Sequence, residues 1–118
     1  MLGTRYTDVR VFLENNGEIT SSTRPAAVIA AFLRSVVGWV TMRQAILPER
    51  TNVTCRRVAA RIRCRGEIRA YLDAKSGEIW YECPECGDNG RITGWEETSW
   101  NRSPSAGGTQ WGAPYDKN

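Results

Sequence analysis

The chain has 118 residues, which suffices for one small domain and not for two. Lysine and arginine together number 16 and aspartate and glutamate 13, so the net charge of +3 permits a nucleic acid or an acidic protein as partner without requiring one. The sequence contains no histidine, which excludes histidine acid–base chemistry, nucleophiles activated by histidine, and histidine-ligated metal sites.

No targeting or membrane-spanning pattern is predicted. The first twenty residues lack a basic start followed by an apolar run. The longest apolar run, 25–33, is interrupted at Arg34 and falls short of the roughly 18 apolar residues that a span needs. We therefore expect a cytoplasmic protein with no membrane partner. In that reducing compartment, cysteines serve as metal ligands or free thiols more often than they form disulfides.

The first segment, 4–22, is polar and mixed. Val9, Val11 and Leu13 recur with the period of two that is typical of a strand, and 15–17 predicts a turn after them. A short helix fits the same residues nearly as well, so both interpretations stay open.

A helix is predicted over 24–46. Thr23 suits the N-cap and Pro25 the first turn, whereas Pro48 would stop the helix. Apolar residues recur at helical spacing in one broad stripe, which comprises Ile29, Phe32, Leu33, Val36, Val37, Trp39 and Val40. We expect the stripe to pack in the core, with a dimer face as the alternative. Gly38 weakens this helix by about 1 kcal/mol relative to alanine.

Short strands are predicted after a linker at 47–52. The first covers 53–57, and the second covers 67–72, where apolar and polar residues alternate. The loop 73–77 ends in a glycine suited to a positive φ and predicts a hairpin that returns along 78–83.

The C-terminal part is rich in turn formers. Residues 84–95 contain several glycines, and within them 88–90 predicts a turn with Asn89 or Gly90 in the left-handed region. Residues 103–118 contain few aliphatic side chains and predict a disordered tail. The fold class expected is therefore α+β, with one long helix packed on a small antiparallel sheet. Residues 1–102 would form the single domain, in which 53–102 is the cysteine-containing sheet region.

The four cysteines form the clearest candidate site. Two of them lie in the run CPECG at 83–87, the spacing of a zinc knuckle, whose turn aims backbone N–H groups at the sulfurs. Zn²⁺ prefers four tetrahedral ligands, and no histidine is available. Cys55 and Cys64 can complete the set if 55–57 and 62–64 are neighbouring strands. The predicted metal ligands are thus Cys55, Cys64, Cys83 and Cys86.

Three other interpretations of the cysteines stay open. They are packed free thiols without metal, a disulfide joining Cys55 to Cys64 or Cys83 to Cys86, and a redox CxxC motif. The redox interpretation fits less well, because glycines and a hairpin surround the motif where a thioredoxin-like site has a helix. Four thiolates make a closed structural site, whereas catalytic zinc keeps a position open, so no enzyme is predicted.

The segment 77–95 resembles part of a group of short, uncharacterised bacterial proteins. Those proteins carry a CPxCGDxGxIxxW pattern, preceded by an arginine-rich stretch with two further cysteines, and the resemblance covers 53–101. It implies a zinc-ribbon-like domain in which Cys83 and Cys86 form the knuckle. It implies no particular activity.

Charge is segregated along the second half of the chain. Residues 53–72 are strongly basic, whereas 73–102 are acidic overall. The arginines either contact the phosphates of a nucleic acid or stay solvated and paired with the acidic half, and neither alternative is preferred. The candidate nucleic-acid contacts are Arg56, Arg57, Arg61, Arg63, Arg65 and Arg69.

Three tryptophans, Trp80, Trp95 and Trp100, lie near the knuckle in the sequence. We expect them to form a small core over the metal site. The alternative is an exposed platform on which bases or a peptide stack.

The function predicted is that of a small non-enzymatic protein with a structural Cys₄ zinc site and an arginine-rich face for nucleic acid. The alternative is a protein-interaction or scaffold module with cysteines that bind no metal. That module would use the helix face around Phe32, Val36 and Trp39.

Overall fold

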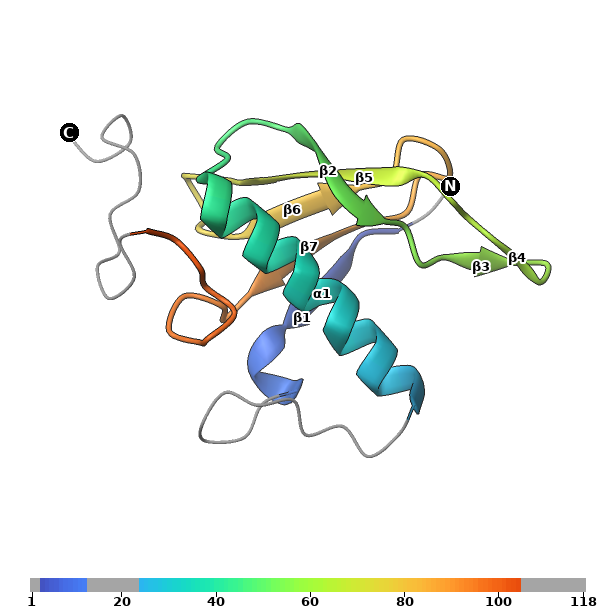
Figure 1. Ribbon diagram of the computed structural model, residues 1–118, viewed down its shortest axis with the longest axis horizontal. Coiled ribbons are helices and arrows are strands. Elements are labelled where there is room, and N and C mark those ends of the chain that lie inside the picture. Colours follow the sequence, from blue (N-terminus) through green and yellow to red (C-terminus); the bar gives the residue numbers. More distant parts are fainter. Residues whose placement is uncertain (1–2, 13–23, 105–118) are drawn as a thin grey trace.

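One helix lies across a five-stranded sheet, and a two-stranded arm extends beyond the end of that sheet (Figure 1). The computed structural model describes residues 3–12 and 24–104. The predicted turn at 15–17, the Thr23 cap and the tail beyond residue 104 lie outside these ranges. Ser103, within the predicted tail, is buried.

The sheet is antiparallel except at one edge. The elements in chain order are β1 (Arg5–Asp8), the 3-10 helix η1 (Val9–Phe12), α1 (Arg24–Arg43), β2 (Glu49–Thr54), β3 (Val58–Ala59), β4 (Ile62–Arg63), β5 (Glu67–Leu72), β6 (Ile79–Glu82) and β7 (Asn89–Thr93). The strand order is β1-β7-β6-β5-β2, and β1 alone runs parallel to its neighbour, β7. The α+β class with one helix is confirmed.

Helix α1 covers one face of this sheet and supplies much of the core. Leu33, Val36, Val37 and Val40 are at most 2% exposed and share one apolar cluster with the inward side chains of β5, β6 and β7. Fully burying such a side chain stabilises the fold by about 1.5–3 kcal/mol. Phe32 meets Tyr81 of β6 edge-on, with ring centroids 5.4 Å apart. Most of the predicted stripe is thus core: Phe32 and Trp39 are half-buried against it, and Ile29 is 47% exposed.

Helix α1 ends earlier than predicted, at Arg43 and not at residue 46. Gln44 adopts a φ of 54°, Ala45 N donates to Val40 O, and Gln44 N donates to Thr41 O. These bonds are those of a Schellman cap, in which the left-handed residue is usually glycine. Pro48 predicted a later helix end. The cap itself was not predictable, because Gln44 occupies the left-handed position where glycine is usual.

The strand predicted at 53–57 is wrong beyond Thr54, where β2 ends. Strands also lie where the sequence predicted other structure. Strand β2 begins inside the predicted linker 47–52, and β7 lies inside the glycine-rich segment predicted as turns. Gly90 pairs with Tyr81, and a Cβ at Gly90 would come within 2.6 Å of the Tyr81 hydroxyl. The turn predicted at 88–90 is therefore wrong, since this glycine makes room for a ring and does not bend the chain.

Of the two structures that the sequence left open for Val9 and Val11, the structure has the helical one. Strand β1 precedes Val9 and Val11, which lie in η1, and Leu13 lies outside the described residues. Val9 is fully buried and Val11 is 72% exposed, so only part of the apolar alternation faces the core.

Replacing Gly38 with alanine is expected to stabilise the fold. A Cβ there meets only the Arg102 side chain, at 3.3 Å, and Arg102 is exposed and able to move. The gain is about 1 kcal/mol, or a rise of about 4–8 °C in Tm. Gly90→Ala serves as the control and should lower Tm. A fall in Tm for Gly38→Ala, measured by circular dichroism, would contradict the packing at Arg102.

Candidate metal centre

Cys55 and Cys64 lie on the two sides of one β-ribbon, residues 55–66, which we call the arm. Thr54 pairs with Glu67 where the arm leaves the sheet. The same register continues outward, with Cys55 N donating to Gly66 O, Cys64 N donating to Arg57 O, Val58 paired with Arg63, and Ala59 paired with Ile62. The prediction that 55–57 and 62–64 are neighbouring strands holds only in part: the paired strands are 58–59 and 62–63, and of 55–57 only Arg57 bonds to this stretch, through Cys64. The continuous register explains how two cysteines separated by eight residues meet.

The tip of the arm is a tight turn of two left-handed residues. Ala60 and Arg61 have φ values of 53° and 66°. Such angles belong to a type I′ hairpin turn, for which asparagine and glycine are preferred. Each non-glycine residue there costs about 1–2 kcal/mol. The arm therefore depends on its base for its stability.

Cys83 and Cys86 lie in a knuckle after β6. Gly87 N donates to Cys83 O at 2.8 Å, and Cys83 N donates to Asp88 O at 2.7 Å. Gly87 has a φ of 84°, which lets the chain fold back after the second cysteine. This local geometry is the one the CPECG run predicted.

The arm and the knuckle bring the four sulfurs together. Their Sγ atoms all lie within 4.8 Å of one another. The closest pairs join the two segments, at 3.7 Å between Cys55 and Cys86 and 3.6 Å between Cys64 and Cys83. A tetrahedral ion bound to thiolates at about 2.3 Å requires sulfurs about 3.8 Å apart. All four thiols are free, so neither predicted disulfide is present, and the cluster can hold a metal ion.

Backbone N–H groups point at the sulfurs from both segments. Arg57 N donates to Cys55 Sγ at 3.5 Å, and Gly66 N donates to Cys64 Sγ at 3.4 Å. The N–H groups of Glu85 and Cys86 likewise favour the thiolate of Cys83. These donors stabilise negative sulfur, which is the form that binds metal.

Burial opposes the charged form of the same thiols when no cation is present. It raises the pKa of Cys55 to about 12 and raises the pKa of Cys83 as well. The pKa of Cys64 is lowered, mainly by the N–H of Gly66. Two of the four cysteines are buried and two are half-buried, and four thiolates at this spacing repel one another, so a bound cation favours the ionisation of all of them.

Five of the six predicted arginines belong to the arm, and Arg69 lies apart on β5. Within 3–12 and 24–104, none of the six has a carboxylate oxygen within 4.0 Å, and the ion pairs that do form use other arginines. Arg56, Arg61 and Arg65 are exposed. The predicted pairing of these arginines with the acidic half does not occur.

The tryptophans do not form a core over the sulfurs. Trp95 Nε1 donates to Gly77 O at 3.2 Å, and Gly77 lies at the opposite end of β6 from Cys83. Trp100 is buried beside Trp39 and Gly38 of α1. The predicted tryptophan core is therefore wrong, because turns after β7 carry both side chains away from the knuckle.

Comparison with protein-family models, with curated proteins and with solved structures found no match. The zinc-ribbon-like resemblance thus stays a prediction, and the functional argument rests on the site itself. Over the described residues, no helix combines the length and the apolar character needed to cross a membrane.

Gly66→Ala is expected to weaken metal binding. A Cβ at Gly66 would come within 2.8 Å of Glu85 Cβ and 2.9 Å of Cys83 Sγ, so it would push the knuckle away from the arm. Displacing groups that orient metal ligands costs about 10- to 100-fold in affinity. A chelator competition titration measures this loss, and Gly3→Ala, whose Cβ would touch nothing within 4 Å, is the control. Equal affinities for the two variants would contradict the close approach of arm and knuckle.

Metal should reverse the pH dependence of stability. Burial raises the pKa of Cys55 and of Tyr81 to about 12 each, so the metal-free fold holds these protons more tightly than the unfolded chain does. Their contribution is complete below about pH 9 and is lost as the pH rises towards 12. Bound metal instead displaces the thiol protons, so the stability of the loaded protein rises from about pH 6 to 9.

Thermal unfolding at a series of pH values, with and without metal, measures how Tm depends on pH in the two samples. Parallel pH profiles for the two samples would contradict a thiolate metal centre.

Proposed function

We propose that this chain is a non-enzymatic nucleic-acid-binding module in which a structural zinc ion fixes the arm to the sheet. The observation that carries the proposal is the meeting of four sulfurs where an arginine-bearing arm leaves the sheet. Two sulfurs belong to the arm and two to the knuckle, so one ion would join them.

The ligand set supports zinc. Four thiolates in tetrahedral arrangement suit Zn²⁺, and such a closed set leaves no position for substrate. The ion would also relieve the repulsion among the thiolates. Its role would be to hold together two segments that bury little apolar surface of their own.

The arm presents more positive charge than its own structure can neutralise. By the register, Arg56 lies opposite Arg65, and strand alternation places Arg63 on this same face, away from the two arm cysteines. Like charges directly opposite across a ribbon destabilise it. Arg63 also has a buried Nε with no hydrogen-bond partner. Phosphate groups would neutralise this face and accept its hydrogen bonds.

Native mass spectrometry, followed by thiol counting after acid denaturation, tests the metal. We expect one zinc ion bound and four free thiols. Cys64→Ser should abolish the bound zinc and lower Tm, whereas Ser76→Cys, in the β5–β6 loop at the far end of the sheet, should leave one zinc in place. Fewer than four free thiols in the wild-type protein would indicate disulfides and contradict the centre.

Salt-dependent binding to DNA and RNA tests the arm. Each phosphate contact contributes about 0.9 to the slope of log K against log salt on duplex DNA, so Arg56→Gln with Arg65→Gln should reduce the slope by about 2. The matched control, Arg34→Gln with Lys75→Gln, removes the same charge from exposed sites off the arm. No binding at low salt, or equal slopes for the two double variants, would contradict the proposal.

A further inference from the structure

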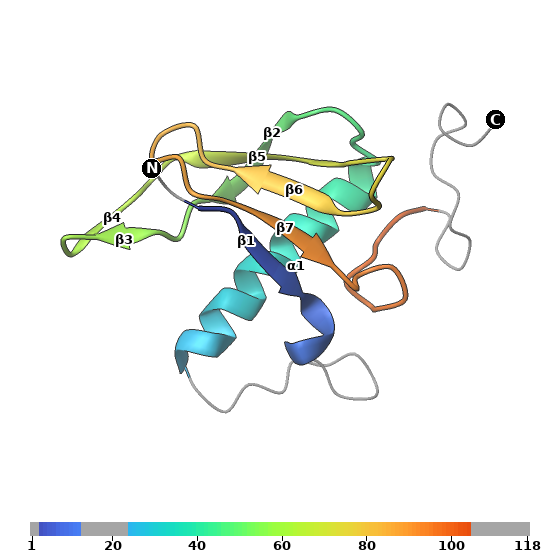
Figure 2. The ribbon, with the colours of Figure 1, turned by 180° about the vertical axis from the view of Figure 1, so that it is seen from behind.

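The face of the sheet opposite α1 is uncovered in the described part of the chain. Figure 2 shows the sheet in front with α1 behind it. A row of four side chains crosses this open face in register, with Tyr6 of β1 opposite Arg91 of β7, Arg91 opposite Trp80 of β6, and Trp80 opposite Tyr71 of β5. We call these four residues the stacking row.

The stacking row is built of planar groups in contact. The Arg91 guanidinium carbon lies 3.7 Å from the Trp80 ring centroid and 5.4 Å from that of Tyr6. The Tyr71 ring lies 5.7 Å from Trp80, tilted by 47°. Aromatic rings and guanidinium planes are the surfaces on which unpaired bases stack.

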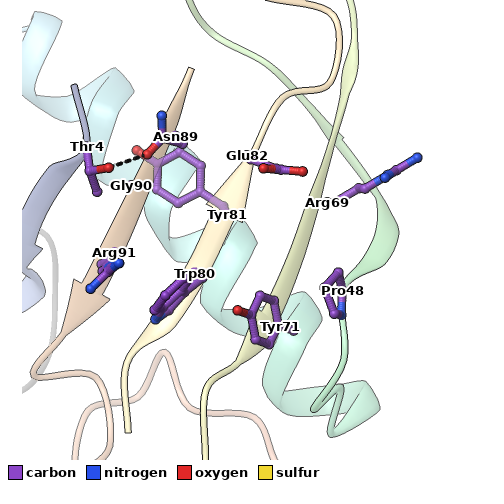
Figure 3. Close-up of a pocket in the computed structure, with 10 residues that line it drawn as sticks. All are labelled: Thr4, Pro48, Arg69, Tyr71, Trp80, Tyr81, Glu82, Asn89, Gly90 and Arg91. Carbon is purple, nitrogen blue, oxygen red and sulfur yellow. Dashed lines mark hydrogen bonds between the residues drawn. The ribbon is translucent and has the colours of Figure 1, made fainter. Parts of the chain in front are cut away.

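A polar row runs alongside it, one step nearer the arm. Asn89 of β7 lies opposite Glu82 of β6, which lies opposite Arg69 of β5. Apart from Tyr6, the members of both rows line one groove with a volume of about 270 Å³, shown in Figure 3. The Glu82 carboxylate accepts hydrogen bonds and the Arg69 guanidinium donates them, so the two match the mixed edge of a base. The Asn89 amide already accepts a hydrogen bond from Thr4 Oγ1 and donates one to Gly87 O.

Two further observations favour a ligand that is anionic as well as planar. Arg69 is exposed and has no carboxylate partner among the described residues, so it is available to a phosphate at the edge of the groove. Strand β5 continues through Glu67 directly into the arm, which begins at the same end of the sheet.

From this arrangement we infer that the open face binds the unpaired bases of a single-stranded nucleic acid, with Arg69 at the edge of the groove contacting its phosphates. The inference rests on the proposed function and adds the class of substrate. In a duplex the base faces are already stacked, so only a single strand can use the stacking row. The protein should therefore bind a single strand more tightly than the duplex of the same sequence.

The test measures binding of the full-length, zinc-loaded protein to three labelled probes by fluorescence anisotropy. The probes are a ten-nucleotide single strand, its duplex, and an abasic strand with the same number of phosphates. Trp80→Leu should weaken binding of the single strand about tenfold and leave the other two unchanged, because stacking on the ring is lost. Tyr71→Leu provides a second variant on the stacking row, should Trp80→Leu fail to fold.

The matched control is Trp39→Leu. Trp39 also stacks against an arginine, Arg43, at 5.0 Å, but it lies on α1, away from the open face. This variant should bind all three probes as the wild-type protein does. Circular dichroism and zinc content verify that each variant is folded.

The outcomes separate the two proposals. One outcome is salt-dependent binding that is equal for the single strand, the duplex and the abasic strand, and unchanged by Trp80→Leu and Tyr71→Leu. That result would contradict base stacking on the stacking row and would still agree with phosphate binding by the arm. Absence of binding to every probe at low salt overturns both. A Trp80→Leu variant that loses binding to an aromatic peptide, but binds the oligonucleotide as the wild type does, would overturn the inference in favour of a protein partner.

Discussion

Four sulfur atoms within 4.8 Å of one another set the main constraint on this molecule. As thiols they fill a partly buried junction, and as thiolates they repel one another strongly unless a cation lies among them. Two sulfurs come from the arm and two from the knuckle after β6. A cation bound at this one junction would therefore join the arm to the sheet more firmly than its backbone hydrogen bonds do alone.

The arm depends on that junction because it has little else to stabilise it. Its tip holds two non-glycine residues in the left-handed region, and Val58 and Ile62 are 61% and 72% exposed. A two-stranded ribbon of this kind is marginally stable alone in water. By contrast, the sheet has its own core against α1. The molecule thus combines a stable layer with an appendage whose order depends on the sulfurs.

The sequence was most informative where structure is local. The CPECG run dictates its own turn, and the apolar stripe of α1 repeats with the period of a helix, so both were predictable. The left-handed Gln44, Ala60 and Arg61 were not, because each residue type disfavours that conformation and the surrounding fold imposes it.

Features that depend on distant pairing were the least predictable. Gly90 belongs to a turn by composition, yet it lies in a strand because Tyr81 needs the space above it. The stacking row joins residues from four strands, and nothing in the local sequence marks Tyr6 as a neighbour of Arg91. The cysteine cluster was accessible only because metal chemistry supplied the long-range constraint that residue spacing lacked.

The parallel edge of the sheet has a consequence for the order in which the molecule assembles. Strands β5, β6 and β7 follow one another as antiparallel neighbours, whereas β1 pairs with β7, and the Thr4–Asn89 hydrogen bond beside them spans 85 positions. During synthesis β1 therefore leaves the ribosome long before its partner exists. Because it has a single neighbour and the longest loop to close, we expect β1 to close the five-stranded sheet last and to be the first of its five strands to detach when the fold opens locally.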